Sequence, residues 1–479
     1  MLLSHGVLAP LMFVGLVIFM MLGFPVAFSL AALGLAFSVI AIETGYFTFA
    51  FMQALPFRIF GIMSNDLLLA IPFFTFMGVV LEKSGLAEDL LDGTGQLFGS
   101  VPGGLAYAVI LVGAVLGAIT GTVAASVIAM GMISLPVMMR YGYNHRLATG
   151  VIAASGTITQ LIPPSLVLVV LADQMGISVG DLYLGAIGPS ILQVAIFVLF
   201  IFAVSIVRPS YMPPLPPEAR TLHGWPLVYK VLKGMIPSLI LIFLVLGTIF
   251  MGLATPTEAG AMGAVGSLIL TWMNGRLTKL LIWQAMDGTM RITAMVVFIL
   301  IGATIFSLVF HGVDGSKWIK DILTALPGGQ TGFLVVVNIF LFFVAFFLDF
   351  FEIAFIVVPL LVPVAKALDI NLVWFAVLIC VNLQTSFMHP PFGFALFYLR
   401  GIAPPAISSS DIYWGAVPWI ILQLMLVAIV IFFPQTVTYW LSDDVVLDPA
   451  AIQRQLDSIQ IPGMGGPSGL PDMPPPRLN

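Results

Sequence analysis

Charge is scarce in this chain of 479 residues. Charged residues make up 8% of the chain and hydrophobic residues 60%, whereas soluble globular proteins carry about 25% charged residues. Uncharged runs recur at 101–139, 147–172, 182–207, 322–348 and 370–399. A membrane-spanning helix needs about 20 apolar residues. The composition therefore excludes an ordinary water-soluble protein and predicts an all-α polytopic protein of the lipid bilayer.

Cysteine and histidine are also rare. The single cysteine, Cys380, excludes a disulfide within the chain and a cysteine metal cluster, and the five histidines are scattered. The sequence has no G-x-x-x-x-G-K-[ST] loop and no H-E-x-x-H motif. We therefore expect no ATP-driven chemistry, no enzyme, no cofactor and no nucleic-acid partner.

The apolar segments divide into two halves of similar length. We expect 1–207 to form the first half and 234–440 the second, joined by a proline-rich basic linker at 208–233. Basic residues in this linker favour the cytoplasmic side. The apolar N-terminal stretch lacks a convincing cleavage site and is expected to remain as the first helix. The tail at 441–479 is rich in proline and glycine and is expected to be disordered.

The two halves share a spacing that indicates a repeat. Pro163-Pro164 and Pro390-Pro391 lie 227 positions apart. The same offset relates Pro136 to Pro363, Asn144 to Asn371, Ser155 to Asn382 and Thr122 to Asp349. Many secondary transporters consist of inverted repeats whose interrupted helices meet at the middle of the membrane. We therefore predict two inverted repeats, each with a broken helix.

The stretch "ASGTITQLIPPS", residues 154–165, interrupts one of the apolar runs. Pro163 and Pro164 remove two backbone donors and disfavour helix before them. Broken helices survive in a membrane only where protein buries them or where they line a cavity. Exposed carbonyls and the hydroxyls of Ser155, Thr157 and Thr159 suit a hard cation, and the start of the next helix suits an anion. The structural alternative is a proline kink whose hydroxyls bond back to the previous turn.

A helical hairpin is expected upstream of each break. The run 103–139 is too long for one span and too short for two with a loop, so we predict a re-entrant hairpin with its tip at Thr120-Gly121-Thr122. The glycines at 113, 117 and 121 are typical of close helix packing. In the second half, Asp349 and Glu352 occupy the corresponding place. Acidic residues inside a membrane usually face a cavity or the bundle interior; the alternative is a loop at the membrane surface.

For two further ionisable residues, Glu258 and His389, a structural role is the favoured interpretation. Glu258 follows Pro256 at a predicted helix start, where a carboxylate complements the positive helix end. His389 precedes the second proline pair and could titrate near neutral pH, but a packed or hydrogen-bonded histidine is the favoured interpretation.

Several long segments resemble one family. The run "GAVLGAITGTVAASVIAMGMISLPVMMRYGYNHRLATGVIAASGTITQLIPPS" is similar to the large membrane subunit of the tripartite ATP-independent periplasmic (TRAP) transporters. The segments "ATPTEAGAMGA", "LDFFEIAFIVVPLLVPVAKALDI" and "NLQTSFMHPPFGFALFYLRG" resemble its second half. The resemblance runs from about Gly23 to Pro434.

This resemblance implies a function beyond the composition. Members of the family sit in the bacterial inner membrane and work with a small membrane subunit and a periplasmic substrate-binding protein. They use a sodium gradient to import organic acids such as dicarboxylates, 2-oxo acids or sugar acids. Their fold implies an elevator mechanism, in which a transport domain with two hairpins and two broken helices moves against a fixed scaffold. No segment for a fused small subunit is evident, which implies a separate partner.

The resemblance also implies candidate ligands, with sodium as the only metal. Sodium site 1 would comprise Thr120, Gly121, Thr122, Ser155, Gly156, Thr157 and Pro163. Sodium site 2 would comprise Asp349, Glu352, Asn382, Thr385 and Pro390. The substrate would lie near Thr122, Ser126, Pro164, His389 and Pro391. The chain departs from the family pattern at His389, where a threonine usually stands.

Three other functions compete with this interpretation. A sodium–dicarboxylate symporter that works without a binding protein would have the same two-hairpin arrangement. An integral membrane enzyme would use Asp349, Glu352 and His389 as catalytic or metal-binding residues. That function calls for paired aspartates or clustered histidines at ligand spacing, and the sequence supplies neither. A channel would need neither broken helices nor a partner.

Overall fold

The computed structural model describes residues 7–120, 123–346, 348–391 and 393–441, and within them every regular element is a helix. Residues up to Trp440 form one compact unit. The predicted tail from 442 onward lies outside the described residues. By length and apolar composition, six helices in the described part of the chain could each cross a membrane, or eight spans if two bent helix pairs each count as one. The prediction of an all-α polytopic membrane protein is confirmed.

The first half contains eleven α-helices. They are α1 (Leu8–Met21), α2 (Val26–Glu43), α3 (Phe49–Met52), α4 (Ala54–Met63), α5 (Ala70–Lys83), α6 (Leu86–Leu97), α7 (Gly104–Thr120), α8 (Val123–Arg140), α9 (His145–Thr157), α10 (Leu166–Met175) and α11 (Val179–Val207). Short 3-10 turns, η1 (Asp66–Leu69) and η2 (Ile158–Gln160), precede α5 and extend α9.

The second half repeats this order. Its helices are α12 (Trp225–Phe250), α13 (Pro256–Met273), α14 (Lys279–Gly312), α15 (Gly315–Thr324), α16 (Gly329–Val344), α17 (Phe350–Glu352), the π-helical turn η5 (Ile353–Val357), α18 (Val358–Ala367), α19 (Leu372–Ser386), α20 (Phe394–Ile402), α21 (Ser409–Phe432) and α22 (Gln435–Thr438).

The 227-residue offset relates whole helices. It places α8 on the stretch from α17 to α18, α9 on α19, and α10 on α20, with ends that agree within two residues. The caps agree as well: Asn144 accepts from two backbone amides at the start of α9, and Asn371 accepts from Trp374 at the start of α19. Asparagine is a strong N-cap because its side-chain oxygen replaces a missing backbone partner. The repeat predicted from a few prolines therefore extends over most of the chain.

The linker differs from the prediction. It was expected at 208–233, but α12 begins at Trp225, so only 208–224 connects the halves. This segment is packed rather than free, because the amides of Gly103 and Asn144 donate to the carbonyls of Met212 and Tyr211. Met212 is fully buried. Apolar side chains within the linker thus override the extended conformation that its prolines favour.

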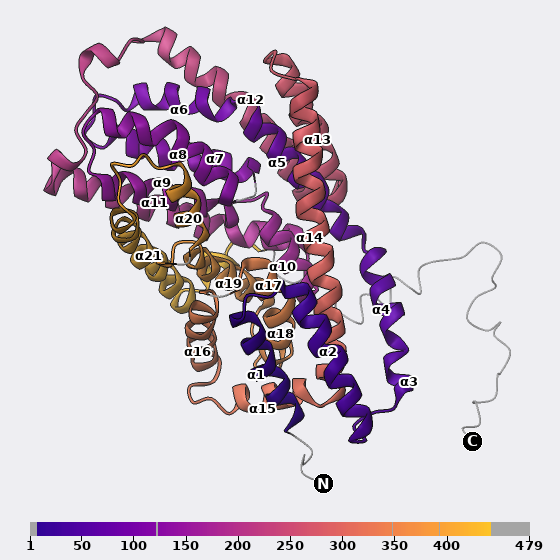
Figure 1. Cartoon of the computed structure of the whole chain (residues 1–479). Helices are drawn as coiled ribbons and strands as arrows, with labels where there is room; N and C mark the ends of the chain where they lie inside the picture. The colour runs from indigo at the N-terminus through magenta and orange to yellow at the C-terminus, as the bar shows by residue number, and fades with distance from the viewer. Residues whose placement is uncertain (1–6, 121–122, 347, 392, 442–479) are drawn as a thin grey trace, which may run out of the picture. The chain divides into compact units, whose positions relative to one another are not determined.

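The two halves are interlocked. One buried apolar cluster contains residues of α6, α7, α8 and α9 from the first half and of α20 and α21 from the second half. A second cluster joins hairpin 2 (α16 and α17–α18) and α19 with α10 and the start of α11 from the first half. Figure 1 shows α20 and α21 lying beside α8, α9 and α11. Each hairpin is therefore held partly by its own half and partly by the other.

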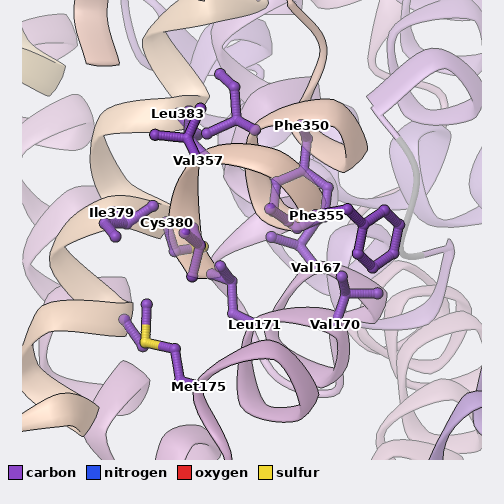
Figure 2. Close-up of a cluster of buried hydrophobic side chains, with 14 of the residues drawn as sticks. Val167, Val170, Leu171, Met175, Phe350, Phe355, Val357, Ile379, Cys380 and Leu383 are labelled. Carbon is purple, nitrogen blue, oxygen red and sulfur yellow. The ribbon is translucent and has the colours of Figure 1, made fainter. Parts of the chain in front are cut away.

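Figure 2 shows the second of these clusters at close range. Val167, Val170 and Leu171 of α10 face Phe350 and Phe355 of hairpin 2, and Ile379, Cys380 and Leu383 of α19 complete the group. All these side chains are buried. Close packing of this kind transmits displacement between elements, because interiors are as dense as organic crystals.

The crossing of α9 and α21 brings backbone against backbone. A Cβ added to Gly150 would lie 2.2 Å from the carbonyl oxygen of Gly415, and one added to Gly415 would lie 2.3 Å from that of Arg146. Both distances are shorter than any van der Waals contact. Glycine at these two positions is therefore what allows the two halves to meet here.

We expect Gly150→Ala to destabilise the protein by about 1–3 kcal/mol, since overpacking forces the backbones apart. Thermal unfolding in detergent, followed by size-exclusion chromatography, measures the change. Gly401→Ala is the matched control, because it lies in α20 with no atom within 4 Å of an added Cβ. Equal midpoints for the two variants would contradict this account of the crossing.

Candidate functional site

Hairpin 1, formed by α7 and α8, lies directly against the first broken helix. A Cβ on Gly113 would come within 2.7 Å of the Cβ of Ser155, and one on Gly117 within 2.8 Å of the Cα of Thr159. The glycine stripe predicted to mediate close packing does so, and its partner is the break itself. Glycine is required because any side chain would separate the hairpin from residues 155–159.

The second arm of hairpin 1 approaches from the other side. A Cβ on Gly156 would lie 2.2 Å from the side chain of Val127 in α8. Ser126, expected near the substrate, precedes Val127 and is buried. α7 ends at Thr120 and α8 begins at Val123, and the predicted tip residues Gly121 and Thr122 lie outside the described residues, as does the side chain of Thr120.

The first break runs from the end of α9 at Thr157 to the start of α10 at Leu166. Pro163 and Pro164 stand within it and are joined by a cis peptide bond. Ser165 connects the two sides: its hydroxyl donates to the carbonyl of Gln160 at 2.6 Å and accepts from the amide of Val167 at 3.2 Å. The thiol of Cys380, from α19, also donates to the Gln160 carbonyl at 3.4 Å. The interrupted backbone is thus partly satisfied by protein groups.

The hydroxyls of this segment bond back to the previous turn, as the structural alternative foresaw. Ser155, Thr157 and Thr159 donate to the carbonyls of the residues three positions earlier, at 2.8, 2.9 and 2.9 Å. Donation uses the hydroxyl hydrogen but leaves oxygen lone pairs. Back-bonding is therefore compatible with these oxygens facing a cation.

The second break has the same construction. Thr385 and Ser386 donate to carbonyls three residues earlier at 2.7 and 2.5 Å, and Pro390 and Pro391 are joined by a cis peptide bond. The amide of Asn382 donates to the carbonyl of Asn338, in the first arm of hairpin 2, at 2.8 Å. α19 and hairpin 2 are therefore linked by a polar contact where the first half uses glycine packing.

His389 is buried among aromatic rings. Its ring stacks on Phe346 at 4.3 Å and meets Phe342 edge-on at 4.2 Å, measured between ring centroids. Only 1% of the residue is exposed, and neither ring nitrogen has a hydrogen-bond partner among the described residues. The expectation of a packed histidine is correct, and that of a hydrogen-bonded one is not.

Asp349 and Glu352 form a capping box at the start of α17. Asp349 accepts from the amide of Glu352, and Glu352 accepts from the amide of Asp349, both at 2.9 Å. Asp349 therefore stands at the tip of hairpin 2, in the position predicted, with both carboxylates engaged in starting a helix. Glu258 forms the same kind of box with Thr255 at the start of α13, in agreement with its structural interpretation.

The two breaks contact each other. The hydroxyl of Thr157 lies 3.7 Å from the sulfur of Met388, and Gln160 meets Cys380 as described above. The two broken helices therefore meet in one buried centre, through residues more than 200 positions apart in the chain.

Two glutamines that sequence reasoning missed fasten this centre. Gln423 of α21 donates to the hydroxyl of Thr157 at 2.8 Å. Gln193 of α11 donates to the side chain of Gln384 in α19. Thr157 and Gln384 are equivalent under the 227-residue offset, so each half contributes a glutamine to the broken helix of the other. Both glutamines are isolated polar residues in apolar spans, which is a recognisable sign of an interior position.

A pattern associated with hydrolases lies between α10 and α11. Residues 176–180 read G-x-S-x-G, which in hydrolases marks a nucleophile on a strand-to-helix turn. Here the segment joins two helices, and the hydroxyl of Ser178 accepts from the amide of Asp181 as the N-cap of α11. The pattern is therefore a helix cap.

Comparison with known proteins places this architecture in a family. The family model for the "Tripartite ATP-independent periplasmic transporter, DctM component" matches residues 13–436. The C4-dicarboxylate TRAP transporter large permease protein DctM of Pseudomonas aeruginosa is 30% identical over 387 residues, covering 80% of this chain and 88% of that protein. The sialic acid TRAP transporter large permease protein SiaM of Vibrio cholerae is 29% identical over 415 residues, covering 86% and 93%.

The 2,3-diketo-L-gulonate TRAP transporter large permease protein YiaN of Escherichia coli is 26% identical over 373 residues, covering 77% of this chain and 85% of that protein. Among solved structures, the Alcanivorax borkumensis YdaH transporter has a TM-score of 0.56 at 15% identity, covering 80% of this chain and 88% of that one. That likeness concerns the fold alone. The chain belongs to the DctM family of TRAP transporter large permease subunits, and it is a multi-pass protein of the bacterial inner membrane and not an enzyme.

Proposed function

We propose that this chain is the permease of a sodium-coupled, binding-protein-dependent importer of organic acids. The observation that carries the proposal is the single buried centre in which two hairpins meet two broken helices. Interrupted helices at the interface of repeats are where secondary transporters hold substrate and coupling ions. A separate small membrane subunit and a periplasmic binding protein complete the tripartite system that the family name describes.

Oxygen donors in both breaks support sodium as the proposed coupling ion. The hydroxyl oxygens of Ser155, Thr157 and Thr159 line the first break, and Asn382 in the second has a buried side-chain oxygen with no partner among the described residues. Hard cations prefer such oxygens to nitrogen or sulfur. Sodium site 1 would use residues 120–122, 155–157 and 163, and sodium site 2 would use Asp349, Glu352, Asn382, Thr385 and Pro390.

The substrate is proposed to be a carboxylate. The relatives are named for C4-dicarboxylate, sialic acid and 2,3-diketo-L-gulonate, all of which are organic acids. α10 and α20 each begin at a break, and the N-terminal end of a helix attracts anions. Ser126, Pro164, His389 and Pro391, together with Thr122 of the first hairpin tip, would surround the substrate between the two hairpins.

The contacts among the helices support an elevator movement, in which one group of helices moves past another. α2 packs backbone to backbone on α14, since a Cβ on Gly302 would lie 2.4 Å from the carbonyl of Ala27. α5 contacts both α13 and α14. We propose that these helices, with α1 and α12, form the fixed scaffold. The hairpins, α9–α11 and α19–α21 would move as one body, because the glutamine links, the Asn382–Asn338 hydrogen bond and the cluster of α6–α9 with α20 and α21 join them.

The remaining alternatives have less support. Within the described residues, no group of three or more histidines, cysteines or carboxylates could hold a metal ion, so nothing favours an enzyme's metal centre. A symporter without a binding protein is separated from the proposal by the uptake assay below.

The proposed function predicts uptake that requires sodium and the binding protein together. The chain is reconstituted with its small subunit and binding protein, and uptake of dicarboxylates, sialic acid and sugar acids is measured. We expect accumulation only with an inward sodium gradient. Uptake driven equally by potassium would refute sodium coupling, and uptake without the binding protein would favour the simple symporter.

Asp349→Asn separates charge from capping, because asparagine caps a helix as well as aspartate does. We expect the sodium concentration for half-maximal uptake to rise roughly tenfold, since an interaction with a charged group contributes about 1.5–3 kcal/mol. Thermal stability should change little. Asp287→Asn, at an exposed pair with Arg291, is the control. An unchanged sodium response in Asp349→Asn would remove this carboxylate from the site.

Thr157→Val tests the hydroxyl of the first break. We expect weaker sodium activation, together with a stability loss of about 1–3 kcal/mol because Gln423 loses its buried acceptor. The double variant Thr157→Val/Gln423→Leu removes both polar groups and should regain stability but not sodium activation. Recovery of sodium activation in the double variant would mean that Thr157 acts only through Gln423. Thr157→Ser, which keeps the hydroxyl, should resemble the native protein.

A further inference from the structure

A cavity of about 770 Å³ lies away from the breaks, where α9 and α21 begin and α11 ends. Its volume falls in the range of roughly 300–1,000 Å³ that is usual for small-molecule sites. Polar side chains gather in its lining, including His145, Arg146, Arg208, Tyr211 and Asp411. The transport site described above uses none of these residues.

The lining carries an excess positive charge. Arg146 is paired with Asp411, with its Nε 3.2 Å from the carboxylate. Arg208 donates to the hydroxyl of Tyr211 at 2.7 Å, and its guanidinium carbon lies 5.1 Å from the centre of the same ring. In the described part of the chain, no carboxylate lies within ion-pair distance of Arg208. A guanidinium held in place by an aromatic ring is suited to bind a phosphate group.

An apolar surface adjoins the charged cavity. On α21, Ile421 and Met425 lie seven and eleven residues after Trp414, on the same face of the helix, and they are 60% and 44% exposed. Trp414, in the cavity wall, is 61% exposed. Tryptophan is enriched at the level of lipid headgroups. A free phosphate ion would need only the arginines, whereas a phospholipid would use both the arginines and the neighbouring apolar stripe.

The repeat provides an internal comparison. At the equivalent positions of the other half, Arg146 becomes Val373, Arg208 becomes Gln435 and Asp411 becomes Leu184. The charged cavity is therefore a departure from the repeat and not a consequence of it.

The basic excess also selects a leaflet. Arg140 lies just before the lining residues 143–147, and Arg220, Lys230 and Lys233 follow the lining residues 200–211. Basic segments between spans favour the cytoplasmic side, where anionic lipid headgroups attract arginine and lysine.

We propose that this cavity binds the phosphate headgroup of an anionic phospholipid, with Arg208 and Arg146 as the phosphate ligands and the acyl chains lying along α21. The bound headgroup would bridge the beginnings of α9 and α21 and the end of α11, which all belong to the body proposed to move. The site is separate from sodium and substrate binding, so its test does not depend on transport.

Native mass spectrometry of the full chain in mild detergent tests the proposal, with phosphatidylglycerol, phosphatidylethanolamine and inorganic phosphate as probes. We expect phosphatidylglycerol to bind more tightly than phosphatidylethanolamine. Arg208→Gln should weaken phosphatidylglycerol binding about fivefold, the effect of one basic residue near an anionic surface, and Arg146→Gln/Arg208→Gln should weaken it further. Arg291→Gln, an exposed arginine of α14, is the matched control.

Asp411→Asn gives a change of opposite sign, because it removes the negative charge that faces the headgroup and should tighten binding. Arg208→Lys keeps the charge and preserves the test if Arg208→Gln does not yield monodisperse protein. Equal binding by all variants, or weaker binding in Asp411→Asn, would overturn the proposal. Displacement of phosphatidylglycerol by millimolar phosphate would identify a free-anion site and overturn the lipid assignment. Equal affinity for phosphatidylethanolamine and phosphatidylglycerol would overturn the assignment of an anionic headgroup.

Discussion

The structure depends on one constraint: a helix interrupted inside a lipid bilayer must find protein partners for its backbone. The break at 158–165 meets this constraint with groups from distant elements. The carbonyl of Gln160 accepts from Ser165 and Cys380, and the end of α9 is covered by glycines of hairpin 1 and by Gln423 of α21. Hairpins, glycine stripes and crossing helices can all be understood as means of enclosing two such breaks without water or lipid.

The two enclosed breaks are similar in construction but differ in the residues that surround them. The two halves share helix order, caps and proline pairs, but they fill equivalent positions differently. His389, between two phenylalanines, stands where the first half has Ile162, and the polar contact of Asn382 with hairpin 2 stands where the first half packs Ser155 against Gly113. A centre built from unequal halves presents different chemistry on its two sides.

Much of this arrangement could be predicted from the sequence. Composition gave the membrane class, and the interval between proline pairs gave the repeat, because proline and glycine act locally and leave a visible pattern. The glutamine links could not be predicted, since Gln193 and Gln423 reach partners through tertiary packing that no local pattern encodes. The linker was misjudged for a similar reason: the burial of Met212 and the early start of α12 at Trp225 depend on neighbouring loops.

The interlocking of the halves has a consequence for how the chain is made. Thr157 and Gln423, which hold the first break, are 266 positions apart. During synthesis, α9 and hairpin 1 leave the ribosome well before α21 exists, so the first break waits in the membrane without its final partners. Contacts between residues so distant in sequence slow folding. The first break therefore gains its final partner only when α21 is in place, so the C-terminal part of the chain completes the N-terminal repeat.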